Sequence, residues 1–165
     1  QESGGRRIKR PIYIKISSIR HLKKEEVEQL KKIQLLKPYI EERQKEIEAY
    51  NLANEADREI LVNGRNLTNV GVFRKYIELY AEQRPDIKKD MTFMVRQLNP
   101  TPHGLPIELY FFTDTTQWTI YEGIMSDMFD HLLASVKYFD LVVFENPASD
   151  DLRSLGDKFN LTLPD

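Results

Sequence analysis

The histidine best placed to do chemistry, His103, lies in the segment "RQLNPTPHGLPIELYFF" (residues 96–112), between two apolar runs. An imidazole titrates near neutral pH and can act as a general base. No Ser, Cys or second His lies near it in the sequence at the spacing of a known motif. The prolines cannot continue a central strand, and Gly104 accepts the positive φ that a long hairpin connection needs. The segment therefore predicts a connection between two strands rather than an active-site loop.

A second group of chemically capable side chains is Asp127, Asp130 and His131, at positions i, i+3 and i+4. On a helix this spacing places three potential metal ligands on one side. At about 100° per residue, however, the two aspartates point nearly opposite the apolar side of the same segment. No further Cys or His completes a ligand set, so these residues are predicted to lie on the solvated side of a helix.

Paired carboxylates for acid and base catalysis are also poorly placed. Glu108 and Asp114 are separated by about 20 Å if the strand between them is extended. The sequence contains no phosphate-binding glycine loop, no nucleophile elbow and no histidine pair. Without cysteine it cannot form a disulfide framework, a zinc ribbon or a thiol nucleophile. We therefore expect no enzyme activity and no catalytic, cofactor-binding or metal-binding residues.

The length of the chain predicts a single domain, and its charges are unevenly distributed along the sequence. The 165 residues are enough for a single core, and no stretch approaches the roughly 18 apolar residues of a membrane span, which predicts a soluble chain. The net charge of −2 conceals an asymmetry, because residues 1–50 carry 13 Lys and Arg against 8 Asp and Glu, whereas residues 101–165 carry 3 against 11. This pattern fits either a solvated monomer or head-to-tail contact between identical subunits.

The first half of the chain shows strand periodicity followed by helical periodicity. Isoleucines at alternating positions predict a strand over residues 8–16. Apolar residues at helical spacing predict helices over residues 25–38 and 69–85, the second with Asn69 as its N-cap. Residues 41–60 are rich in Glu, Lys, Arg and Ala and predict an exposed helix.

The second half predicts a hairpin, a helix and a last strand. Residues 91–98 and 107–113 are rich in β-branched and aromatic residues, which favours two strands joined by the proline-rich connection. A strong helical period covers residues 118–136, and residues 141–144 supply an apolar strand. The remaining tail, residues 148–165, is acidic and weakly patterned.

These elements predict an α+β domain over residues 11–147. With residues 41–85 treated as a helical insertion between the first helix and the second strand, the order becomes βαββαβ, the ferredoxin-like pattern. Right-handed crossovers would place helices 25–38 and 118–136 on one face of a four-stranded antiparallel sheet.

The other face of the sheet is predicted to carry an aromatic patch formed by Tyr13, Tyr110 and Phe112. An uncovered aromatic patch usually meets a partner. One alternative is that the inserted helices fold back over it; the helical face that would do so consists of Phe73, Ile77 and Tyr80. A second alternative is an identical subunit or another domain of a longer chain.

A third alternative is RNA, because RNA-recognition domains stack bases on such aromatic side chains in this fold class. The glycine-and-aromatic signature of those domains is absent, and the acidic C-terminal third would repel phosphates. We therefore expect no nucleic-acid partner, and binding of RNA or another ligand at this face remains the alternative function.

Four stretches resemble the C-terminal cytoplasmic part of small-conductance (MscS-like) mechanosensitive ion channels, specifically the miniconductance YbdG-type subgroup. They are "GRRIKR" (residues 5–10), "GRNLTNVGVFRKYIELY" (64–80), "MTFMVRQLNPTPHGLPIELYFF" (91–112) and "MFDHLLA" (128–134). The match extends over most of the chain, and the strings are long.

The resemblance implies a non-catalytic role as cytoplasmic cage and assembly domain of a channel that opens under membrane tension and protects cells from osmotic stress. It implies a homo-oligomer, commonly a heptamer, held in the inner membrane by upstream helices, with this domain on the cytoplasmic side. Residues 5–10 would join a small upstream β-domain, and the helical insertion would be the mark of the longer subgroup. Conduction and tension sensing would then lie outside these residues.

Overall fold

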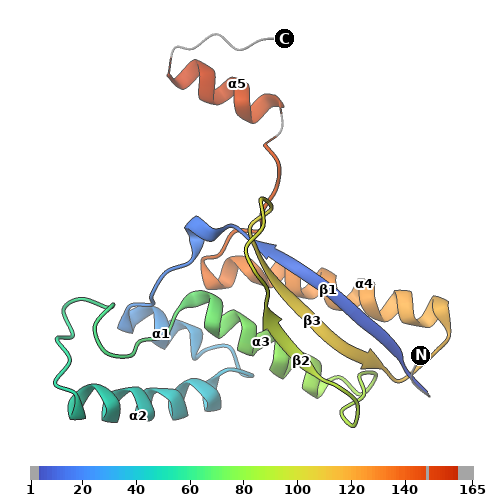
Figure 1. Ribbon diagram of the computed structural model, residues 1–165, viewed down its shortest axis with the longest axis horizontal. Helices are drawn as coiled ribbons and strands as arrows, with labels where there is room; N and C mark the ends of the chain where they lie inside the picture. The colour runs from blue at the N-terminus through green and yellow to red at the C-terminus, as the bar shows by residue number, and fades with distance from the viewer. Residues whose placement is uncertain (1–3, 148, 160–165) are drawn as a thin grey trace.

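The protein has an α+β fold built on a three-stranded antiparallel sheet with the strand order β1-β3-β2. The computed structural model describes residues 4–147 and 149–159. In chain order the elements of Figure 1 are β1 (Arg6–Ile14), α1 (Lys24–Leu30), α2 (Lys37–Ala53), α3 (Asn69–Gln83), β2 (Met94–Gln97), β3 (Leu105–Thr113), α4 (Trp118–Ser135) and α5 (Ser149–Lys158). Two short 3₁₀ turns, Ile16–Ser18 and Val136–Phe139, follow β1 and α4. No helix in these described ranges is both long and apolar enough to cross a membrane.

The core lies between one face of the sheet and the two helices α3 and α4. That face carries the buried side chains that oppose one another across the two long strands, namely Ile8 with Phe111, Ile12 with Ile107 and Ile14 with Leu105. Burying each such side chain contributes about 2 kcal/mol. The predicted core-facing row of isoleucines is therefore confirmed for Ile8, Ile12 and Ile14, whereas Ile16 lies beyond the end of β1 in a 3₁₀ turn and is 49% exposed.

The helix that pairs with α4 over this face is α3, not the helix predicted over residues 25–38. Phe73 and Ile77 of α3 are fully buried in the same core as the strands, and the Phe73 ring lies 5.1 Å from that of Phe139. The prediction that these residues fold back over the opposite face is therefore wrong. The physical reason is that α3 has a wide apolar side, whereas α1 is only seven residues long and buries only Val27 and Leu30.

The excursion between β1 and α3 therefore consists of α1, α2 and the loop that follows them (Figure 1). α2 begins at Lys37 rather than near residue 41, because Pro38 falls in the first helical turn, where a missing N–H costs nothing. The N-cap of α3 is Thr68, whose Oγ1 accepts a hydrogen bond from the Gly71 N–H at 3.1 Å. Asn69, the predicted cap, has a different role described below.

The predicted four-stranded sheet is wrong in its last strand. Residues 141–144 form one isolated bridge, Ile14 to Val143, in which the Phe144 N–H donates to the Tyr13 carbonyl at 2.9 Å. The Lys15 N–H likewise donates to the Val142 carbonyl at 2.7 Å. Only four apolar residues lie between the turn that ends with Asp140 and the polar Glu145-Asn146, so this segment is too short to form more than a bridge. The described sheet therefore lacks the complete βαββαβ pattern.

The C-terminal region is more regular than predicted, because α5 occupies part of the weakly patterned tail. Figure 1 shows α5 standing apart from the sheet and its covering helices. Residue 148 and residues 160–165 of that tail lie outside the described residues, as do residues 1–3 at the other end. Residues 6–10 belong to β1.

Candidate interaction surface on the open sheet face

The face of the sheet opposite α3 and α4 is not covered by the described helices (Figure 1). Side chains at cross-strand partner positions point to the same face. From the register, this face carries Arg7, Lys9, Pro11 and Tyr13 of β1, Met94 and Arg96 of β2, and Pro106, Glu108, Tyr110 and Phe112 of β3. We call it the open face. The predicted placement of Tyr13, Tyr110 and Phe112 away from the helices is confirmed, but only Tyr13 and Tyr110 are partly exposed, because Phe112 is buried at 8% exposure.

An ion pair between a buried carboxylate and a partly exposed guanidinium lies in the middle of the open face. Glu108 is only 4% exposed, its Oε1 accepts a hydrogen bond from Arg96 Nε at 2.9 Å, and the same oxygen lies 2.8 Å from Arg96 Nη2. A carboxylate so far from water needs this partner. The two residues are directly opposite each other in the β2–β3 register. The sequence alone did not predict this pair, because the length of the proline-rich connection does not determine which residues of the two strands face each other.

Cationic side chains flank the aromatic ring of Tyr110. The guanidinium carbons of Arg7 and Arg96 each lie 5.8 Å from the centre of this ring, and Phe112 packs edge-on at 6.2 Å. Lys9 is exposed and lies directly opposite Tyr110 on β1. A guanidinium within about 6 Å of an aromatic ring is attracted to its face. The open face is therefore both aromatic and positively charged at this point.

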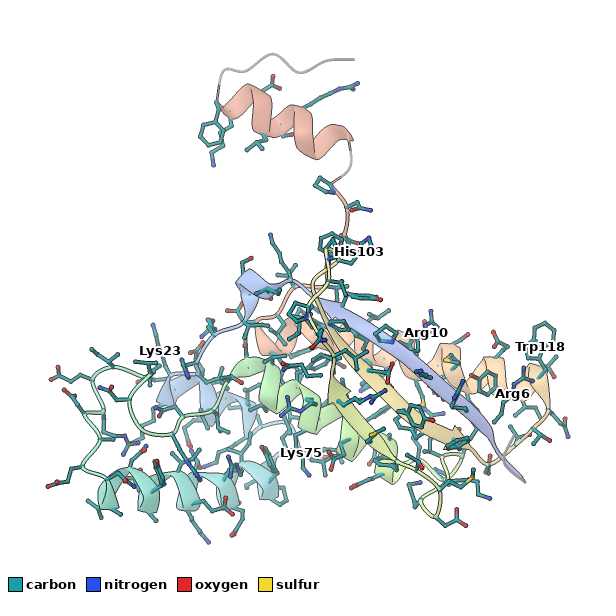
Figure 2. All side chains as sticks on the ribbon, in the orientation of Figure 1. Arg6, Arg10, Lys23, Lys75, His103 and Trp118 are labelled. Carbon is teal, nitrogen blue, oxygen red and sulfur yellow. The ribbon has the colours of Figure 1, made fainter. Side chains whose placement is uncertain are left out.

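The other basic residues of β1 turn toward α4 instead. The Arg6 guanidinium lies 4.9 Å from the centre of the Tyr121 ring, and that of Arg10 lies 4.6 Å from the Phe129 ring (Figure 2). The Tyr121 hydroxyl donates a 2.6 Å hydrogen bond to the Arg7 carbonyl, which faces the free edge of β1. Both rows of β1 thus carry positive charge, one on the open face and one beside α4.

His103 lies at the tip of the β2–β3 hairpin, where Thr101 and Gly104 exchange backbone hydrogen bonds (Figure 2). Its exposed ring makes edge contacts with Tyr13 at 6.2 Å and with Phe144 at 5.6 Å. The prediction that this segment is a connection is confirmed. The His103 N–H also donates to Thr101 Oγ1 at 3.0 Å.

The three potential metal ligands of α4 are not gathered around a common point. Asp127 accepts a 2.6 Å hydrogen bond from Arg84 Nη1, and His131 Nε2 lies 2.6 Å from the Tyr76 hydroxyl. Asp130 is exposed. In the described residues, no three Cys, His, Asp or Glu side chains are close enough together to hold a metal ion. Asp127 and His131 instead join α4 to α3 and its C-cap Arg84.

Glu108 and Asp114 do not meet either. Glu108 is bound to Arg96 on the open face, whereas Asp114 follows β3 and donates its N–H to the Asp86 carbonyl at 2.9 Å. The residues between Glu108 and Asp114 belong to the extended strand β3, as the predicted separation of these two carboxylates requires. The sequence did not identify either partner, because both come from segments distant in the chain.

A second charged cluster has a structural role near the start of α3. Arg20 Nη1 donates a 2.8 Å hydrogen bond to Glu26 Oε1, and Arg20 Nη2 donates one of 2.6 Å to Asp140. The bond from Arg20, helped by the Lys23 N–H, lowers the pKa of Glu26 to about 2. The same two carboxylates raise the pKa of Arg20. This cluster holds the turn after α4 against the segment before α1.

Asn69 lies beneath this cluster and is fully buried. Its Oδ1 accepts from the Arg20 N–H at 3.0 Å, and its Nδ2 donates to the Ser18 carbonyl at 2.9 Å and to the Asp140 carbonyl at 3.3 Å. One amide therefore joins three segments that are distant in sequence. The local sequence indicated a helix cap here because Asn is a common capping residue.

No family model matches this sequence. The open face is the surface whose side chains best fit a molecular interaction, since it combines partly exposed aromatic rings with Arg and Lys and is left open by the described helices. Such surfaces mark sites where another molecule binds.

Proposed function

We propose that this chain is the cytoplasmic vestibule and assembly domain of a tension-gated ion channel similar to the small-conductance mechanosensitive channels, of the miniconductance subgroup. A neighbouring subunit covers the open face in this proposal. The observation that carries it is the uncovered, positively charged aromatic surface around Tyr110. The role is non-catalytic, and the pore and the tension sensor belong to membrane-spanning segments outside these residues.

The positions of the resembling stretches support the proposal. Residues 64–80 form the turn and most of α3, residues 91–112 form the β2–β3 hairpin, and residues 128–134 lie on α4. These elements build the sheet and the two helices that cover it, so the resemblance involves the core of the domain and is not confined to its surface loops.

The arrangement of strands supports a reduced ferredoxin-like fold. The bridge at Val143 places residues 141–144 beside β1, so that the four segments run in the order 141–144, β1, β3, β2. In this interpretation the fourth strand of the ferredoxin-like sheet is shortened to one bridge, and α1 with α2 forms the insertion that distinguishes the longer subgroup.

In an oligomer, commonly of seven copies in channels of this kind, the domain would enclose a vestibule beneath the pore in the inner membrane. Ions would reach the pore through openings whose charge is set by nearby Arg, Lys, Asp and Glu. Contact through the open face would remove the Tyr110 surface from water and place Arg7 and Lys9 against the partner.

The test uses the natural protein that contains this chain, expressed in cells that lack other mechanosensitive channels. The wild type is expected to give tension-activated currents in membrane patches and to improve survival of a fall in external osmolarity. The variant Arg7→Glu/Lys9→Glu reverses two exposed charges on the open face and is expected to weaken the oligomer, as measured by light scattering in detergent.

The matched control is Lys32→Glu/Lys37→Glu, which reverses two exposed charges in the excursion between β1 and α3. It is expected to assemble normally. Absence of any tension-activated current from the wild type would overturn the channel proposal. Full assembly of the Arg7→Glu/Lys9→Glu variant would overturn the assignment of the open face as the subunit contact.

RNA is the second candidate partner of the open face, because Arg7 and Lys9 lie beside Tyr110 and offer phosphate contacts next to an aromatic ring. Titration of labelled single-stranded RNA at low and high salt tests it. Micromolar binding that weakens steeply with salt and is lost in Tyr13→Ala or Tyr110→Ala would make RNA the first candidate. Equal, weak binding by the wild type and by Tyr110→Ala would remove it.

A further inference from the structure

An open groove of about 1380 Å³ lies between α1, α2 and the loop of residues 58–67, away from the open face. Val27, Ile47 and Leu52 supply part of its apolar lining, and Leu52 is largely exposed. Five Lys and Arg and three Glu line it, which leaves a positive balance. The basic residues include Lys23 and Lys24 at the start of α1 (Figure 2).

The helix α5 has properties that complement this groove. Leu155 and Phe159 lie four residues apart, on one side of the helical turn that the Phe159 N–H closes onto the Leu155 carbonyl at 3.1 Å. They are 50% and 59% exposed. Over residues 145–165 the sequence carries five Asp and Glu against two Lys and Arg. α5 and the segments that flank it are thus acidic, with an exposed apolar side.

A helix of this length needs a partner. An isolated helix shorter than about 12 residues is marginal in water, and most helices in proteins are stabilised by packing of one face. α5 has ten residues, contains Gly156, and stands apart from the sheet and its covering helices (Figure 1). Its apolar side therefore lacks the packing that would stabilise it within the described part of its own chain.

We propose that α5 of one copy binds the groove between α1 and α2 of a second copy. Leu155 and Phe159 would enter the apolar part of the groove, and the net negative charge of residues 145–165 would favour the approach to Lys23 and Lys24. The contact joins different surfaces of the two copies, so it is head-to-tail and can close into a ring. It rests on the assembly role proposed above, to which it adds a second subunit contact.

A second copy is the preferred partner because the linker to α5 is short. The four residues 145–148 span at most about 14 Å when extended. Figure 1 places α5 beyond the hairpin tip, whereas α1 and α2 lie on another side of the molecule, beyond α3. The opposite charge balance of the two surfaces favours their contact, and this contribution weakens as salt is added.

The absence of cysteine from the sequence makes disulfide cross-linking a direct test. The 165-residue chain is prepared as two single variants, Leu155→Cys and Ala49→Cys, the second in an exposed position of α2 within the groove. The two proteins carry tags of different mass and are mixed under mild oxidation. A disulfide between them requires the two Cβ atoms to approach within about 4.5 Å.

The expected result is a mixed dimer at least fivefold more abundant than that formed by Leu155→Cys with Lys9→Cys, whose cysteine lies on the open face. Lys23→Glu/Lys24→Glu, added to the Ala49→Cys chain, is expected to reduce the yield by at least half. Equal yields from the groove pair and the open-face pair would overturn the proposal.

A chain carrying both Leu155→Cys and Ala49→Cys identifies the partner. If it forms the disulfide within itself while the mixed single variants form none, the second-copy assignment is overturned. The cross-linking test needs neither a membrane nor a current, so its outcome is independent of the channel measurement. The cross-link can be absent although tension-activated currents are recorded, and it can form although no current is recorded. The failures of the two proposals are therefore distinguishable.

Discussion

Arg96 of β2 and Glu108 of β3 form an ion pair across the hairpin, on the face of the sheet that α3 and α4 do not cover. The carboxylate is buried although it lies on the open side, because Arg96 and the neighbouring side chains of the sheet shield it from water. The pair therefore removes a charge from the middle of the open face and leaves Arg7 and Lys9 as its positive groups.

Removing Arg96 is expected to destabilise the fold. In Arg96→Ala the Glu108 carboxylate loses its charged partner while the other side chains of the sheet still cover part of it, which lowers the free energy of unfolding by about 2 kcal/mol. Urea denaturation followed by far-UV circular dichroism measures it. Trp fluorescence is less suitable because the single tryptophan, Trp118, is 63% exposed and would report poorly on the core.

Two controls separate the ion pair from general effects at this face. The double variant Arg96→Leu/Glu108→Leu replaces both partners and is expected to remain within about 1 kcal/mol of the wild type. Lys9→Ala, at an exposed position of the same face, is expected to change stability by less than about 0.5 kcal/mol. A double variant as unstable as Arg96→Ala would contradict the assignment of the loss to an unpaired carboxylate.

Asn69 is expected to be among the most sensitive positions of the chain. Asn69→Ala removes three hydrogen bonds to two other segments, residues 18–20 and Asp140, and leaves carbonyl and N–H groups unpaired, for a loss of about 3 kcal/mol in the free energy of unfolding. Thermal unfolding by circular dichroism measures it, with Asn99→Ala at an exposed position as the control. A loss no larger than that of the control would contradict a structural role for this amide.

Replacing glycine by alanine is expected to lower the stability of the protein at one position and to raise it at another. Gly104 has φ +99°, and an added Cβ would lie 2.5 Å from the Ile14 carbonyl oxygen, so Gly104→Ala is expected to destabilise by about 2 kcal/mol. Gly123 lies within α4 with open space around it, so Gly123→Ala is expected to stabilise by about 1 kcal/mol. Denaturant midpoints of the two variants measure both effects, and shifts of the same sign would contradict this account.

The ion pair between Arg20 and Glu26 is expected to make the stability of the folded protein depend on pH in the acidic range. Because the folded-state pKa of Glu26 is lowered from 4.5 to about 2, its contribution is fully present above pH 4.5 and is lost as the pH falls toward 2. Both side chains are partly exposed, so solvent screening limits the contribution to about 1 kcal/mol.

Measuring the stability of the wild type and of Glu26→Gln between pH 2 and pH 7 isolates this contribution. The difference between the two proteins is expected to be greatest above pH 5 and to disappear near pH 2. A difference that stays constant across this range would show that Glu26 contributes through its shape rather than its charge.

The sequence by itself determined those elements whose signals are local. Alternating isoleucines identified the core-facing row of β1, prolines with Gly104 identified the hairpin connection, and a helical period identified α4. It also placed Tyr110 and Phe112 on the face away from the helices, because side chains alternate along a strand. The α+β class followed from the order of these elements.

Only the tertiary structure decided which helix covers the sheet. The segments around α1 and α3 have similar apolar spacing, and the choice depends on which buries more apolar surface against β1, β2 and β3. Likewise, the Arg96 to Glu108 pair depends on strand register, and the reduction of the fourth strand to one bridge depends on how residues 141–144 meet β1. Asn69 joins three distant segments, so its role exists only once these segments have met. Local patterns encode local geometry, whereas pairings between distant residues are set by the packing of the whole chain.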